Sequence, residues 1–128
     1  MTIRALSFAM LAAGLLSGGD GSGVAGSWTG ESLCTGVRGA CKDEHVIWTF
    51  KAPDRNGRVW SSADKVVDGQ RINMGTGELQ FDPEASTLTM KIPLGVWKLT
   101  MKGDTIDATL TLNDGQIVRR MTLKKDKS

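Results

Sequence analysis

The chain has 128 residues, which is enough for one domain and too few for two. Its 16 basic residues against 14 acidic ones give a formal net charge of +2. A nucleic-acid partner requires a basic stripe that neutralises phosphates, so this near balance predicts no nucleic-acid binding. The lysines near the C-terminus are expected to be solvated, with residues 125–128 forming a tail.

The N-terminal segment has the layout of a secretory signal peptide. A short basic start that includes Arg4 is followed by an apolar run at 5–16 and by small residues at 17–19. As a helix, this run rises only about 18 Å, which is too short to span a hydrocarbon core about 30 Å thick. We therefore expect a signal peptide at 1–18, a periplasmic or secreted protein, and no membrane insertion of the mature chain.

The stretch LLSGG is similar to a bacterial lipobox, in which a lipid-bearing cysteine follows leucine, a small residue and glycine. Gly19 stands where that cysteine would be, so lipid attachment is not expected. Residues 19–25 are rich in glycine and are predicted to form a flexible linker. The folded domain is then expected at 26–124.

From Gly26 onward, apolar and polar side chains alternate, as in strands with one buried face and one wet face. Clear alternation covers residues 46–50, 79–82, 87–92, 97–102, 106–112 and 117–124. Turn signals such as Asn56-Gly57 and Asp114-Gly115 separate these segments. The sequence Gly75-Thr76-Gly77 is expected to bend a long strand at 70–82. The count is therefore eight strands, or nine if the bend is a full turn.

Short antiparallel strands joined by short turns predict an all-β fold, an up-and-down β-barrel. A single open sheet would leave its apolar face wet and both edges unpaired, and closure removes both problems. The alternative is a two-sheet sandwich, which needs longer crossovers than these turns provide.

Cys34 and Cys41 are the two cysteines of the chain, and both follow the signal segment. In an exported protein, two cysteines predict one disulfide, and the glycines between them allow the loop to bend. Redox pairs usually lie closer in sequence, and zinc needs more ligands than two cysteines and one histidine provide. We therefore expect a structural disulfide, with no metal site and no cofactor.

The stretch Gly26-Ser27-Trp28 at the head of the first strand resembles the Gly-x-Trp signature of the lipocalin and calycin barrels. In those families the tryptophan plugs one end of the barrel, and an arginine of the last strand packs across it. The resemblance implies that Gly26, Trp28 and Arg119 close the barrel, with Arg119 over the ring of Trp28. The segments GESLC and ACKDEHV are most similar to small exported bacterial barrels of this type, a kinship that implies no activity.

The alternation of the last strand also places Arg119 on the inward face and Arg120 in water. A charged residue on an apolar face needs a partner, and a tryptophan ring supplies one. A shift of one residue in the strand would exchange the two arginines.

The cluster Lys42-Asp43-Glu44-His45 is the one stretch that suggests catalysis. A triad also needs a positioned nucleophile, which the sequence does not supply. Asp43 and His45 share a face, but it is the outward one, because Val46 and Trp48 point inward. We therefore expect a protein that is not an enzyme.

The barrel interior is the better candidate for function, since an eight-stranded barrel is either just filled by side chains or holds one small ligand. In the stretch VWSSADKVV, small residues face large aromatic ones, and this can leave an apolar pocket with a few polar anchors. The predicted ligand-binding residues are Trp48, Ser61, Ala63, Met90, Trp97 and Met101. Met74 joins the inward set if the bend keeps the alternation.

The expected partner is a small apolar or amphipathic molecule inside the barrel. The alternative is a barrel of the protein-interaction or protease-inhibitor type, in which these residues simply fill the lumen. Such a barrel would bind a protein partner through the segment at 20–25 or through the loop between the cysteines.

Overall fold

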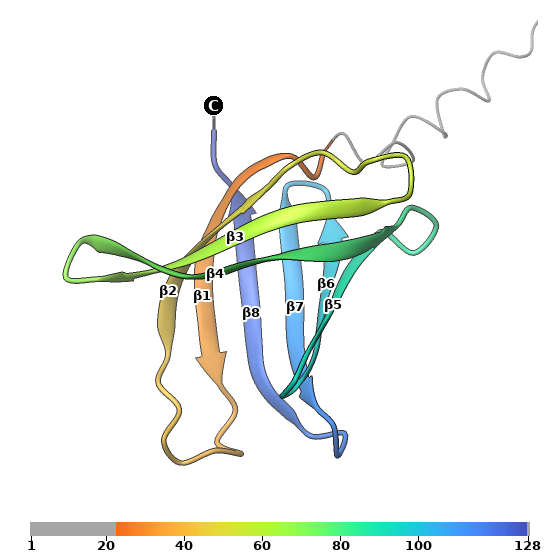
Figure 1. Cartoon of the computed structure of the whole chain (residues 1–128). Helices are drawn as coiled ribbons and strands as arrows, with labels where there is room; N and C mark the ends of the chain where they lie inside the picture. Colours follow the sequence, from red (N-terminus) through yellow and green to blue (C-terminus); the bar gives the residue numbers. More distant parts are fainter. Residues whose placement is uncertain (1–22, 128) are drawn as a thin grey trace, which may run out of the picture.

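The computed structural model describes residues 23–127, so the predicted signal peptide at 1–18 and the first part of the linker lie outside the described residues. The described chain forms one closed barrel of eight antiparallel strands, in which β8 pairs with β1 (Figure 1). The strands are β1 (Gly26–Cys34), β2 (Glu44–Phe50), β3 (Arg58–Val67), β4 (Gln70–Asp82), β5 (Thr87–Ile92), β6 (Gly95–Lys102), β7 (Thr105–Leu112) and β8 (Ile117–Lys125). The prediction of an all-β barrel is confirmed, and the sandwich is not formed.

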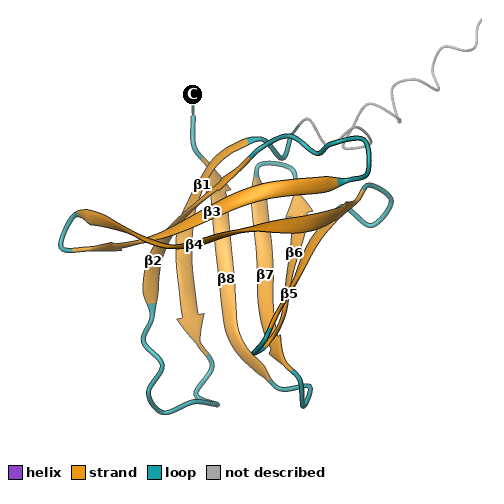
Figure 2. Cartoon of the chain, in the orientation of Figure 1, coloured by secondary structure: helices purple, strands orange, loops and turns teal. Residues whose placement is uncertain are grey.

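Strands, loops and turns account for all of residues 23–127, as Figure 2 shows. No part of this range forms an apolar helix of membrane-spanning length. Because successive strands reverse direction, the loops gather at two ends of the barrel. We call the end with loops 51–57, 83–86 and 103–104 the closed end, and the end with loops 35–43, 93–94 and 113–116 the open end.

The core lies mainly toward the closed end, where inward side chains of all strands meet. Its largest fully buried side chains are Trp28, Leu79, Leu88, Leu99, Ile106 and Leu123. Burial of such a side chain contributes about 1.5–3 kcal/mol each. This end of the barrel is therefore the main source of stability.

The segments next to the barrel take part in this packing. Val24, in the predicted linker at 19–25, is fully buried, and its carbonyl oxygen accepts a hydrogen bond of 3.0 Å from Trp28 Nε1. At the other terminus, β8 continues to Lys125, and the backbone N–H of Asp126 donates to the carbonyl oxygen of Ser27 at 2.9 Å. The strands of the barrel therefore run from Gly26 to Lys125, and Val24 and Asp126 contact the barrel on either side of them.

Two glycines let neighbouring strands approach closely. A Cβ atom added at Gly30 would lie 1.8 Å from the carbonyl oxygen of Thr122, and one at Gly95 would lie 1.9 Å from that of Thr111. No side chain fits at such distances, so these positions accept only glycine without a backbone shift.

Strand β4 departs most from a regular barrel. Its register against β3 shifts between Ala63 and Asp64, which leaves Met74 without an opposite residue, and Gly75 has a φ of 143°. The bend at 75–77 is therefore a bulge within one continuous strand, and the barrel has eight strands rather than nine.

Beyond the bulge, β3 and β4 leave the barrel wall as a two-stranded arm, residues 64–74, which projects to the left in Figure 1. Strand β4 pairs with β3 over ten residue pairs but with β5 over only three, from Gln80↔Thr89 to Asp82↔Thr87. The barrel wall is consequently open between β4 and the end of β5.

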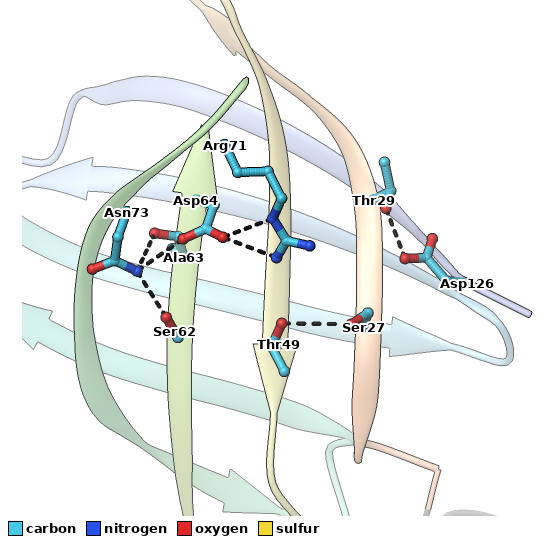
Figure 3. A network of polar contacts seen from close by, with 9 residues as sticks. All are labelled: Ser27, Thr29, Thr49, Ser62, Ala63, Asp64, Arg71, Asn73 and Asp126. Atoms are coloured by element: carbon cyan, nitrogen blue, oxygen red, sulfur yellow. Dashed lines mark hydrogen bonds and ion pairs between the residues drawn. The ribbon is translucent and has the colours of Figure 1, made fainter. Parts of the chain in front are cut away.

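A polar network on the outer surface holds the arm at its base (Figure 3). Asp64 accepts hydrogen bonds from Arg71 Nε at 2.9 Å and from Asn73 Nδ2 at 2.8 Å, and Asn73 also donates to Ser62 Oγ at 2.9 Å. The hydrogen bond from Asn73, together with the guanidinium of Arg71, lowers the pKa of Asp64. These bonds bridge the bulge and fix the direction of the arm.

Candidate functional site

A cavity of about 430 Å³ occupies the open half of the barrel and is lined by residues of all eight strands. Its volume falls in the range of about 300–1,000 Å³ that is usual for small-molecule sites. Its wall has three parts: aromatic and methionine side chains, small residues, and a charged rim.

The aromatic part consists of Trp48 and Trp97, whose rings meet edge to face with centroids 5.8 Å apart. Trp48 is only 4% exposed, and its indole Nε1 is the one buried side-chain atom that lacks a hydrogen-bond partner among residues 23–127. An unmet buried donor costs about 1–3 kcal/mol. Within the described chain, the protein leaves Trp48 Nε1 unpaired, whereas it pairs Trp28 Nε1 with the carbonyl oxygen of Val24.

The cavity exists because two paired strands carry almost no side chains where they face Trp48 and Trp97. Ser61 lies opposite Gly77 and Ala63 lies opposite Gly75, and all four residues line the cavity. The Ser61 hydroxyl donates to the carbonyl oxygen of Gly77 at 3.0 Å, so its hydrogen is already engaged.

Methionines border the opening between β4 and β5. Met74, at the bulge, is 44% exposed and lines the cavity. Met90 of β5 reaches toward β4, because a Cβ atom added at Gly77 would lie 3.0 Å from the Met90 sulfur. Methionine side chains are flexible and adapt to irregular apolar ligands.

Charged side chains form the rim at the open end. Arg119 donates from Nη1 to Ser32 Oγ at 3.0 Å and from Nη2 to the carbonyl oxygen of Lys42 at 2.8 Å. Its Nη1 also lies 3.7 Å from Oε1 of Glu44. The side chains of Arg119 and Glu44 are only 17% and 24% exposed, so this ion pair is partly withdrawn from water.

The disulfide holds the loop that supplies one of these contacts. Cys34 and Cys41 are bonded, which confirms the predicted pairing and is compatible with an oxidising compartment. Asp43 accepts a hydrogen bond of 2.8 Å from the backbone N–H of Cys34 and so closes the loop at its base. The loop thereby positions the carbonyl oxygen of Lys42 beside Arg119.

The predicted packing of Arg119 across Trp28 is wrong. Arg119 lies opposite Cys34, whereas Trp28 lies opposite Lys125. The two levels are about 20 Å apart along β1, at about 3.3 Å per residue. Because β8 runs antiparallel to β1, only the C-terminal end of β8 reaches the level of Trp28.

At the closed end, Lys125 takes the place expected for the arginine. Its Nζ lies 5.5 Å from the ring centroid of Trp28, within the range of a cation–π contact. Gly26 lies beside it, since a Cβ atom added there would be 3.3 Å from Lys125 Cε. Arg120 is exposed, as the alternation of the strand predicts, and Arg119 faces the interior.

All of the predicted ligand-binding residues except Met101 line the cavity. Met101 lies opposite Ile106 and packs against the core nearer the closed end. Sequence reasoning missed Ser32 and Glu44 of the rim. Glu44 was detectable, because it shares the inward face of Val46 in the alternation of its strand.

The stretch considered for catalysis does not converge on one site, because Lys42 and Asp43 lie in the loop at 35–43 and Glu44 and His45 point to opposite faces of β2. The His45 imidazole contacts the Glu31 carboxylate on the outer surface, where their side chains are 44% and 56% exposed. Asp43 is engaged with the backbone of Cys34. Of this stretch, Glu44 alone has a side chain that lines the cavity.

No protein-family model matches the chain, and a search of curated proteins finds no similar sequence.

Proposed function

We propose that this protein is an exported, non-enzymatic barrel that binds one small apolar or amphipathic molecule in the cavity at its open end. The observation that carries the proposal is the cavity itself, about 430 Å³ in volume and walled by Trp48, Trp97 and Met90. Apolar walls with a few convergent polar groups are typical of ligand sites. A protein-interaction barrel would need no such space, since a filled lumen would serve it better.

Export to the periplasm or outside the cell is part of the proposal. The disulfide between Cys34 and Cys41 supports it, because such bonds persist in oxidising compartments. The basic start and apolar run of the first residues support it as well. Kinship with the lipocalin and calycin barrels is supported by the closed antiparallel barrel and by the buried Trp28 at its closed end.

A fluorescence titration tests the proposal. The neutral apolar probe N-phenyl-1-naphthylamine is expected to brighten on binding to the folded protein. Ala63→Phe places a ring in the cavity and is expected to weaken binding about tenfold or more, equivalent to about 1.4 kcal/mol or above. Lys98→Phe adds the same ring to an exposed position on β6 and is the matched control.

Circular dichroism and thermal melting establish that each variant is folded. If the folded wild-type protein binds neither this probe nor other apolar probes, the proposal fails. It also fails if Ala63→Phe and Lys98→Phe bind the probe equally well, since binding would then lie outside the barrel.

A further inference from the structure

We infer that the rim selects ligands whose head group is uncharged and both donates and accepts hydrogen bonds, such as a hydroxyl or a carboxamide. The inference rests on the proposed function and specifies its ligand class. Its basis is that opposite charges, Arg119 and Glu44, face the cavity side by side at a distance of 3.7 Å.

Both groups keep hydrogen-bonding capacity after their contacts within the protein. Arg119 uses Nη1 for Ser32 and Nη2 for Lys42, and its Nε has no partner among residues 23–127. The Glu44 carboxylate accepts no hydrogen bond from this part of the chain, because 3.7 Å is too long for one. Among residues 23–127, Trp48 Nε1 is the one buried side-chain nitrogen or oxygen without a hydrogen-bond partner, so the unpartnered atoms of Arg119 and Glu44 are accessible.

The arrangement favours some head groups and disfavours others. A hydroxyl or a carboxamide can accept a hydrogen bond from Arg119 and donate one to Glu44, and both bonds gain strength from the charged partner. A carboxylate would be attracted by Arg119 but repelled by Glu44, and an ammonium group would meet the opposite conflict. The rim therefore discriminates against either charge.

The rest of the cavity sets the orientation of the ligand. The apolar wall formed by Trp48, Trp97 and Met90 receives a hydrocarbon chain, while the rim lies at the open end, near the disulfide loop. An amphipathic molecule thus binds with its chain inward and its head group at the rim. The head group is the part of the ligand that the protein can distinguish by hydrogen bonding.

Displacement of N-phenyl-1-naphthylamine by four compounds of equal chain length tests this inference. They are decanol, decanamide, decanoate and decylamine, each used below its micelle concentration at neutral pH and low salt. Decanol and decanamide are expected to displace the probe at concentrations about tenfold lower than decanoate and decylamine.

Two variants then separate the charges. Glu44→Gln leaves the positive charge alone and is expected to improve binding of decanoate about tenfold without helping decylamine. Arg119→Gln is expected to do the reverse. Glu31→Gln and Arg120→Gln make the same charge changes on exposed residues and should leave the order of the four compounds unaltered.

The outcomes separate the two proposals. If no compound binds and the probe does not bind either, the proposed function itself fails. If the compounds bind but decanoate or decylamine is preferred by the wild type, or the order is the same in Glu44→Gln, the inference on the head group is overturned while the proposed function stands. Arg119 also bonds the backbone, so if Arg119→Gln does not fold, Glu44→Gln decides alone.

Discussion

The two ends of the barrel differ in how their tryptophan side chains are packed and hydrogen-bonded. At the closed end, Trp28 is fully buried, its Nε1 is bonded to the carbonyl oxygen of Val24, and Lys125 lies over its ring. At the open half, Trp48 is buried with an unmet Nε1, and Trp97 beside it lines an open space. The packing that stabilises the fold and the proposed binding site therefore lie in separate halves of one small domain.

The division between the two halves affects the stability of the fold. The cavity lowers the stability of the fold because the side chains around it lose packing contacts, and Trp48 Nε1 gains no hydrogen bond from residues 23–127. A domain of this size has only about 5–15 kcal/mol of net stability. The fully satisfied packing around Trp28 offsets these costs, and the open half can retain a space that a purely structural barrel would fill.

Truncation of one tryptophan at each end of the barrel is expected to produce the largest difference in stability. Trp28→Ala is expected to lower the free energy of unfolding by about 3–5 kcal/mol, because it removes a fully buried ring. Trp97→Ala is expected to cost about 1–2 kcal/mol, because part of its indole already faces the cavity. Urea denaturation followed by circular dichroism measures both values.

Equal losses for the two variants would show that the two halves contribute alike to stability, and the proposed division would be wrong.

Arg119→Ala and Lys125→Ala test which residue contacts Trp28. Since Arg119 lies about 20 Å from Trp28 along the strand, its removal should leave the fluorescence of Trp28 unchanged. Lys125→Ala is the variant expected to alter that fluorescence.

The disulfide provides the next largest effect. Replacing Cys34 and Cys41 together by serine is expected to lower the free energy of unfolding by about 2.5 kcal/mol, the value for so short a loop. Because the loop positions the carbonyl oxygen beside Arg119, the variant should also lose its discrimination among head groups. Urea denaturation and probe displacement measure the two effects, and a variant that discriminates like wild type would show that the loop does not support the rim.

Much of this arrangement could be predicted from alternation in the sequence, and the failures share one cause. Alternation tells which face a residue occupies, and it correctly placed Trp48, Met90 and Trp97 inside and Arg120 outside. It does not tell how far along the barrel axis a residue lies, because that level depends on the register between strands. Arg119 and Met101 were therefore given the right face and the wrong level.

The bulge of β4 illustrates a second limit. Its glycines indicated a bend, but whether the strand turned back or continued depends on the pairing with β3. That pairing is made by residues far from the bend in the sequence. The arm, and the opening between β4 and β5 that follows from it, could not be read from the alternation of either strand alone.

Acid should weaken the arm through Asp64. Its pKa is lowered in the folded protein, first by the hydrogen bond from Asn73 and then by Arg71. A carboxyl group with a lowered folded pKa contributes stability that is complete above its unfolded pKa and is lost as the pH falls through the folded value. Asp64→Asn is expected to reduce the loss of stability between neutral pH and pH values below its ordinary pKa of 3.8.

Thermal melting across this pH range, with hydrogen exchange of the arm amides, measures the effect. Asp54 serves as a control at the closed end, because the backbone N–H of Arg58 lowers its pKa as well. Asp54→Asn should change the acid response without altering exchange in the arm. If Asp64→Asn and wild type show the same acid response and the same exchange in the arm, the network around Asp64 does not secure the arm.

The smallest effect is expected at His45, next to a residue of the rim. Its imidazole pairs with Glu31 on the outer surface, and exposed ion pairs contribute about 0–1 kcal/mol. His45→Ala should therefore leave probe binding and head-group preference unchanged and shift the free energy of unfolding by less than about 1 kcal/mol. Glu44→Gln, one position earlier, should change the preference and so define the boundary of the site. If folded His45→Ala loses probe binding, the outer face of β2 takes part in recognition. The binding site would then not be confined to the inner face of the barrel.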